Sequence, residues 1–113
     1  MSDKCNFANQ QALSSTQAQL EQEALLAKQA KALAHPARVR ILKILFTLDK
    51  LGGCLNSDLV SELGLAQSTV SEHLRILKQA GFILAEPNPP KVCYRVKRDT
   101  LEEFNQLFGS IFN

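Results

Sequence analysis

Apolar residues in the middle of the chain recur at the spacing of an amphipathic helix. In the segment 67–80 the apolar side chains fall on one face of the helix, whereas short polar side chains fall on the other. Gly81 follows this segment as a natural C-cap. A shorter amphipathic segment, 56–63, precedes it and ends at Gly64. Because only a short turn separates the two segments, they predict a helix-turn-helix.

Two more helices are predicted upstream. The segment 36–48 starts with proline and is apolar on most sides, so we expect it to be the central helix of the core. The segment 20–34 is rich in good helix formers. For the short helix 56–63, we expect Asn56 or Ser57 at the N-cap and Asp58 in the first turn.

After Gly81 the pattern changes from helical to extended. The apolar run 82–86 predicts a strand. The segment 87–91 contains three prolines, which predicts a stiff turn that continues neither helix nor strand. The segment 92–97 alternates, with Val92, Tyr94 and Val96 expected on one face and Cys93, Arg95 and Lys97 on the other. A hairpin directly after the second helix of a helix-turn-helix predicts a mainly α fold with a small β wing, a winged helix-turn-helix.

The chain ends differ from each other in pattern. Residues 1–15 are polar and lack periodicity, which predicts a flexible N-terminal arm. Residues 16–113 are then one winged helix-turn-helix domain, with the modest core that 113 residues allow. The last segment carries an apolar stripe on a terminal helix, and such a stripe packs either on its own core or on a partner.

Composition narrows the functional class. The net charge of +2 is low for a nucleic-acid binder, but basic residues gather near the central helix and in the wing. No apolar run reaches membrane-spanning length and no signal-peptide core is present, so we expect a cytoplasmic protein without membrane contact. The three cysteines are then expected to be thiols. No nucleophile elbow, phosphate loop or carboxylate pair indicates an enzyme.

Three separated motifs resemble the ArsR/SmtB family of bacterial repressors. They are the segments 31–42, 67–74 with 80–82, and 92–96, and the resemblance spans residues 28 to 112. It implies a homodimer that binds a palindromic operator in double-stranded DNA and is released by a ligand, usually a metal or metalloid ion. It also implies dimerisation through the segment 20–34 and the terminal helix. The predicted dimerisation residues are Leu20, Leu101, Phe104, Phe108 and Ile111.

The outer face of 67–80 and the wing hold the candidate DNA contacts. Glutamine and arginine offer bidentate hydrogen bonds to base edges, and basic residues of the wing can reach phosphate. The predicted DNA-contacting residues are Gln67, Ser68, Thr69, Ser71, Glu72, Arg75, Lys91 and Arg95. Relatives often carry histidine at the position of Glu72, where a carboxylate can instead accept from cytosine N4. We interpret His73 as a packed, satisfied core histidine and His35 as a helix-start residue.

The usual metal sites of the family are missing, because 56–63 has no cysteine and 100–113 has no histidine. The remaining candidate metal ligands are Cys54, Cys93 and Cys5. Cys54 precedes the helix-turn-helix and Cys93 lies on the second wing strand, so the two thiols can be cross-strand neighbours.

These three thiolates would suit trivalent arsenic or antimony, with arsenite as an inducer, or copper(I) or zinc. DNA binding itself would need no cofactor. Three alternatives stay open. The cysteines can merely fill space, or Cys54 and Cys93 can form a redox-sensing disulfide. The chain can also be a protein-interaction module without DNA binding, which Glu72 and the low net charge favour.

Overall fold

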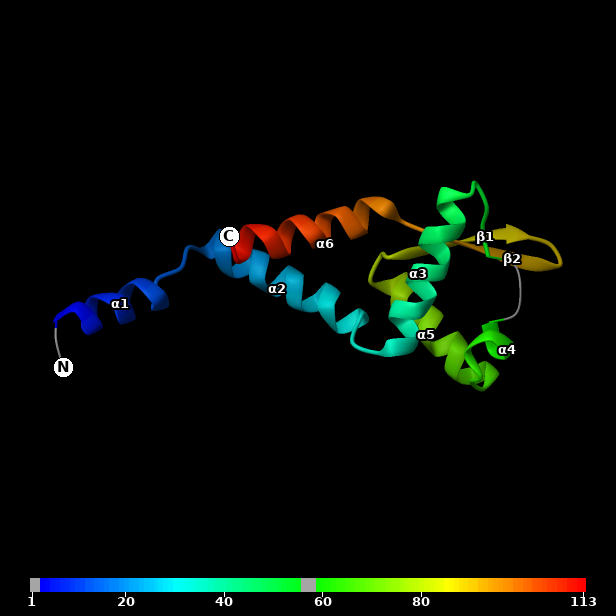
Figure 1. Ribbon diagram of the computed structural model, residues 1–113, viewed down its shortest axis with the longest axis horizontal. Helices are drawn as coiled ribbons and strands as arrows, with labels where there is room; N and C mark the ends of the chain where they lie inside the picture. The colour runs from blue at the N-terminus through cyan, green and yellow to red at the C-terminus, as the bar shows by residue number, and fades with distance from the viewer. Residues whose placement is uncertain (1–2, 56–58) are drawn as a thin grey trace.

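The computed structural model of the protein describes residues 3–55 and 59–113 (Figure 1). Within these ranges it is mainly helical with one two-stranded antiparallel sheet, which confirms the predicted winged helix-turn-helix. The elements in chain order are α1 (Asp3–Leu13), α2 (Gln17–Ala32), α3 (Pro36–Lys50), α4 (Leu59–Leu63), α5 (Gln67–Gln79), β1 (Ile83–Asn88), β2 (Lys91–Val96) and α6 (Arg98–Ile111). The predicted capping residues Asn56, Ser57 and Asp58 lie outside the described residues.

The elements are arranged along one axis, and the molecule measures 67 × 27 × 21 Å. Helices α2 and α6 lie side by side, while α3, α4, α5 and the hairpin gather at the other end (Figure 1). Helix α1 extends beyond the paired end. The segment predicted as a flexible arm is thus helical over Asp3–Leu13, but none of these residues is buried.

The start of α2 differs from the prediction because a capping box forms ahead of it. The Thr16 hydroxyl accepts from the Gln19 amide at 3.1 Å, and the Gln19 side chain accepts from the Thr16 amide at 2.9 Å. This reciprocal pair starts the helix at Gln17 rather than at residue 20. Helix α3 begins as expected, since His35 is its N-cap and accepts from the Ala37 amide at 3.0 Å.

The core lies where α3, α5 and the hairpin meet. Its largest fully buried side chains are Ile41, Leu45, Leu77, Phe82 and Ile83. Helix α5 ends in a Schellman motif, in which the Phe82 amide donates to Leu77 and the Gly81 amide to Lys78. Gly81 has φ +83°, a conformation that glycine adopts without strain. This turn directs the chain from α5 straight into the wing.

The wing is longer than the proline pattern predicts. Strand β1 continues through Pro87 and Asn88, which pair with Val92 and Lys91, so the turn is shorter than 87–91. Proline is tolerated here because each strand of a two-stranded sheet is an edge strand. Both faces of β2 are partly covered, since Cys93 and Val96 are both buried although they point to opposite faces.

A single residue ahead of the helix-turn-helix joins the hairpin as an isolated bridge. Leu55 pairs with Tyr94 through two backbone hydrogen bonds of 3.0 and 2.9 Å. This pairing lays the segment that leads into α4 against β2. The helix-turn-helix and the wing are therefore connected on two sides, by the Gly81 turn and by this bridge.

Candidate nucleic-acid interface

The outer face of α5 is polar and open to solvent. Val70, His73 and Leu77 face the core, whereas all six predicted DNA contacts of this helix are exposed. Those six are Gln67, Ser68, Thr69, Ser71, Glu72 and Arg75. No side chain caps the N-terminus of α5 at Ala66, so its first-turn amides keep their donor capacity for an acceptor from outside.

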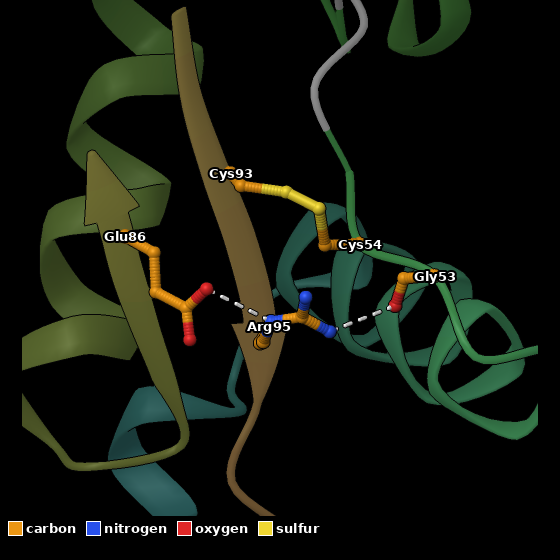
Figure 2. Close-up of a disulfide and its surroundings, with 5 residues drawn as sticks. All are labelled: Gly53, Cys54, Glu86, Cys93 and Arg95. Carbon is orange, nitrogen blue, oxygen red and sulfur yellow. Dashed lines mark hydrogen bonds and ion pairs between the residues drawn. A yellow bond between two sulfur atoms is a disulfide. The ribbon is translucent and has the colours of Figure 1, made fainter. Parts of the chain in front are cut away.

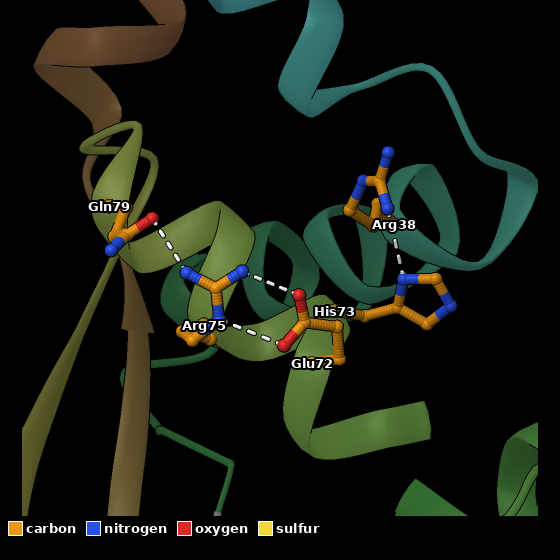
Figure 3. A network of polar contacts seen from close by, with 5 residues as sticks. All are labelled: Arg38, Glu72, His73, Arg75 and Gln79. Carbon is orange, nitrogen blue, oxygen red and sulfur yellow. Dashed lines mark hydrogen bonds and ion pairs between the residues drawn. The ribbon is translucent and has the colours of Figure 1, made fainter. Parts of the chain in front are cut away.

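Arg75 is held in place by neighbours on its own helix (Figure 3). Its Nε donates to Glu72 Oε2 at 2.8 Å, and its Nη2 contacts Glu72 Oε1 at 2.5 Å. Its Nη1 donates to Gln79 Oε1 at 2.8 Å. Hydrogen bonds from Arg75 lower the pKa of the Glu72 carboxyl, and the carboxylate raises the pKa of Arg75. In the free protein, therefore, the positive charge of Arg75 is largely offset, and DNA must compete with Glu72 for it.

His73 is packed as expected but only half satisfied. Its Nδ1 lies 3.1 Å from Arg38 Nη1, whereas its buried Nε2 has no hydrogen-bond partner among the described residues. Its ring also lies against that of His35, with the centroids 4.4 Å apart. Burial is the main cause that lowers the pKa of His73, and the charges of His35 and Arg38 lower it further. Through its contacts with Arg38 and His35, His73 joins α5 to the start of α3.

The two predicted wing contacts differ in how free they are. Lys91 is exposed beside the hairpin turn. Arg95 is half-buried, and it donates to Glu86 Oε2 at 3.1 Å and to the Gly53 carbonyl at 3.3 Å (Figure 2). Arg95 therefore fastens β2 to β1 and to the segment before α4, a role that its position on an alternating strand did not reveal.

Cys54 and Cys93 are joined by a disulfide between that same segment and β2 (Figure 2). Their Cα atoms lie 5.7 Å apart, within the range that a disulfide spans. Because Leu55 pairs with Tyr94, Cys54 is diagonal to Cys93 rather than directly opposite. The expectation that all three cysteines are thiols is thus wrong for this pair, which instead forms the disulfide that its cross-strand placement left open as an alternative.

The third candidate metal ligand lies elsewhere. Cys5 is on α1, and Figure 1 shows α1 and the hairpin at opposite ends of the molecule. No group of three His, Cys, Asp or Glu side chains able to hold a metal ion is found in the ranges 3–55 and 59–113. The chain thus brings two of the three predicted ligands together and leaves Cys5 apart.

The predicted dimerisation residues divide into two groups. Leu101 and Phe104 pack against the core of their own chain, with Phe104 against the Phe82 ring at 6.3 Å. Farther along, Phe108 is 54% exposed, and Leu20 on α2 is 47% exposed. Ile111 is half-buried. The stripe therefore serves its own core at its start and remains uncovered at its end. Phe112, the last residue of the predicted stripe, is 68% exposed.

Basic residues of α2 lie beside the recognition helix and were missed from the sequence. Lys28 and Lys31 share a pocket with Arg38 and Arg75. Their spacing of three residues on one helix face was the available signal, but it does not show which element that face meets. Separately, no helix in the described part of the chain is long and apolar enough to cross a membrane.

Comparison with known proteins places the chain in a family. Residues 35–84 match the family described as bacterial regulatory protein, arsR family. The uncharacterized HTH-type transcriptional regulator Rv0081 of Mycobacterium tuberculosis is 37% identical over 73 residues, which are 65% of this chain and 61% of that protein. The uncharacterized regulator MJ1325 of Methanocaldococcus jannaschii is 32% identical over 81 residues, which are 72% of this chain and 88% of that protein. The chain thus spans about three fifths of Rv0081 but most of MJ1325.

Solved structures of related proteins have the same fold as this chain. Reduced HlyU from Vibrio cholerae superposes with a TM-score of 0.65 at 28% identity, covering 81% of this chain and 94% of HlyU. The cadmium metal-sensor CMTR from Mycobacterium tuberculosis gives a TM-score of 0.51 at 36% identity, covering 73% of this chain and 81% of that one. Rv0081 and MJ1325 are HTH-type transcriptional regulators, which agrees with the expectation that the chain is not an enzyme. The chain belongs to the arsR family of bacterial regulatory proteins.

Proposed function

We propose that the protein is a transcriptional repressor that binds operator DNA as a homodimer. The observation that carries this proposal is the open polar face of α5, bordered by the wing and by basic side chains. The uncovered apolar side chains of Leu20, Phe108 and Phe112 support pairing of two copies through α2 and α6. A two-fold dimer presents its recognition helices to successive major grooves, about 34–36 Å apart, so the operator is palindromic. Since the operator is the target, this activity belongs to the cytoplasm.

Control of DNA binding is assigned in this proposal to the Cys54–Cys93 pair. The disulfide sits where the segment leading into α4 meets the wing strand, so its state affects how both lie against DNA. Peroxide is a suitable oxidant. One thiolate attacks a peroxide oxygen and breaks the O–O bond, which forms a sulfenic acid and expels hydroxide, and this hydroxide takes a proton from solvent to become water. The other thiol then attacks the sulfenic sulfur, closes the disulfide and releases a second water. In this scheme the reduced repressor holds the operator and the oxidised one releases it.

A second candidate is control by a soft ion such as arsenite or cadmium. CMTR, with which the chain shares its fold, is a cadmium sensor. The reduced pair would supply two thiolates to such an ion. The third ligand, Cys5, lies at the opposite end of the same chain, so a three-thiolate site requires Cys5 from the second copy of the dimer. The disulfide favours the redox scheme, because oxidation needs only the two cysteines that are already together.

The test is fluorescence anisotropy on a duplex taken from the DNA upstream of the protein's own gene. Binding is measured at fixed salt in reductant, after peroxide, and in reductant with arsenite. Cys54→Ser and Cys93→Ser are compared with Cys5→Ser as the matched control. Redox control predicts that peroxide releases the unmutated protein and Cys5→Ser but neither of the other variants. Release by arsenite that also needs Cys5 supports the metalloid scheme instead.

The same assay tests whether DNA is the partner at all. Affinity that falls steeply as salt rises is the mark of phosphate contacts. A protein-interaction module without DNA binding would show no salt-dependent binding to the upstream duplex or to a scrambled one. That result would overturn the repressor proposal.

A further inference from the structure

A pocket of about 400 Å³ lies between α2, α3 and α5, at the edge of the recognition face. Four of its lining side chains are cationic, and we call them together the cationic pocket: Lys28, Lys31, Arg38 and Arg75. Gln79 adds an amide, and the rest of the wall is apolar, formed by Ala32, Ile76 and Ala80. The volume is within the range of ligand-binding clefts in proteins.

The positive charge of this pocket is only partly balanced. Glu72 pairs with Arg75, but among the described residues no carboxylate forms an ion pair with Lys28, Lys31 or Arg38. Three cations therefore converge on one cavity whose lining, in the described part of the chain, includes no carboxylate. Such an arrangement repels itself unless an anion from outside is bound.

Arg38 is positioned rather than mobile. Its Nε donates to the Ala32 carbonyl at 2.6 Å, its Nη2 donates to the Lys31 carbonyl at 3.4 Å, and its Nη1 lies 3.1 Å from His73 Nδ1. These contacts satisfy carbonyls at the end of α2 and fix the guanidinium at the pocket wall. Two of its five N–H groups remain for a ligand. Phosphate oxygens match such a guanidinium, with lysines as flexible point charges around it.

The position of the pocket indicates which phosphate it takes. Arg75 and Gln79 line the pocket and also belong to the exposed face of α5 that carries Ser68 and Ser71. A duplex that lies along this face carries its backbone past the pocket on the side of α2. Phosphate contacts of this kind fix the orientation of a protein on DNA but read no sequence.

We propose that the cationic pocket binds a backbone phosphate of the DNA next to each recognition helix, so that α2 joins the DNA interface. This inference rests on the proposed function and extends it to residues outside the helix-turn-helix and the wing. Lys28 and Lys31 supply mobile charge, and Arg38 supplies the fixed donors. The pocket adds affinity that is the same for every sequence, whereas the α5 face supplies the specificity.

The experiment compares Lys28→Gln/Lys31→Gln with the matched control Lys4→Gln/Lys50→Gln, which removes the same charge from exposed positions elsewhere on the chain. Both lysines of the test pair are exposed on a helix, and glutamine is a good helix former, so the fold is expected to survive. Thermal unfolding checks this for both variants. Anisotropy is then measured on the upstream duplex and on a scrambled duplex across a range of salt.

The slope of log affinity against log salt is expected to become shallower by about 0.9 for each phosphate that the protein no longer neutralises, or about 1.8 for a dimer with two pockets. The ratio of the DNA affinity of the unmutated protein to that of the test variant should then fall roughly tenfold when salt is raised from about 50 to about 200 mM. The affinity should fall equally on both duplexes, and the control variant should keep the original slope.

A slope unchanged in the test variant, while the unmutated protein binds DNA, overturns this inference alone. No salt-dependent binding by the unmutated protein overturns both this inference and the proposed function. Inorganic phosphate is also added without DNA, against chloride of equal ionic strength. If it raises the unfolding midpoint of the unmutated protein only, and the slope is unchanged, the pocket takes a small phosphate compound instead of DNA.

Discussion

Opening the Cys54–Cys93 disulfide should destabilise the fold measurably. The two cysteines are separated by 39 positions in the sequence, so the cross-link closes a long loop in the unfolded chain. The loop-closure relation gives about 4 kcal/mol of stabilisation at 25 °C for a loop of this length, and disulfides typically contribute about 2–4 kcal/mol. For a domain of this size each kcal/mol moves the unfolding midpoint by roughly 4–8 °C. We therefore expect the midpoint to fall by at least about 8 °C when the bond is reduced.

The assay is thermal unfolding of the oxidised and the reduced protein at one protomer concentration, since pairing of two copies also affects the midpoint. Cys54→Ser should unfold like the reduced protein and should ignore reductant. Cys5→Ser should keep the full difference between the two states. Midpoints of the oxidised and reduced protein that agree within about 2 °C, well below the shift expected for this loop, would refute the loop-closure reasoning.

Three further predictions concern single side chains. Glu72→Gln removes the carboxylate that holds Arg75. In anisotropy, the affinity of this variant for scrambled DNA should rise, and that affinity should fall more steeply with salt. An unchanged affinity would contradict the idea that Glu72 competes with DNA for Arg75. Because burial lowers the pKa of His73 below its ordinary value of 6.5, the unfolded chain binds the extra proton as pH falls. Stability to urea should therefore be full above about pH 6.5 and decline below it, and His73→Gln should flatten the decline. Phe108→Glu should convert the dimer to a monomer in sedimentation equilibrium, whereas Gln106→Glu, on the opposite side of α6, should leave it dimeric. A Phe108→Glu protein that is still a dimer would show that the end of α6 is not part of the dimer interface.

Much of the fold is written in local patterns. The helical spacing of apolar residues predicted α3 and α5, and the alternation after Gly81 predicted the hairpin. The local preference of Pro87 predicts too short a first strand, because it does not reveal that both strands of the wing are edges.

The candidate site was harder to predict, because it depends on contacts between distant positions. Arg38 and His73, for example, are 35 residues apart. Cys54 and Cys93 are 39 residues apart, and their meeting could be expected only because the second wing strand was recognised in the sequence. Periodicity identifies the outward face of α5, but it does not show that Arg75 is already hydrogen-bonded to Glu72. The cationic pocket likewise arises only when α2 is laid beside α5. Local sequence therefore predicts elements, whereas the register and packing between elements decide which polar groups are free to bind.

The isolated bridge between Leu55 and Tyr94 allows hydrogen exchange to follow the opening of the contact between the helix-turn-helix and the wing. These two residues exchange both of their backbone hydrogen bonds with each other, directly beside the disulfide. While the cross-link is closed, their amide protons can reach deuterated solvent only when a larger part of the domain opens. Once the sulfurs are reduced, parting of the bridge alone exposes both. The deuterium uptake of two backbone positions thus reports the fraction of molecules in which the helix-turn-helix and the wing are separated, without any label on the chain.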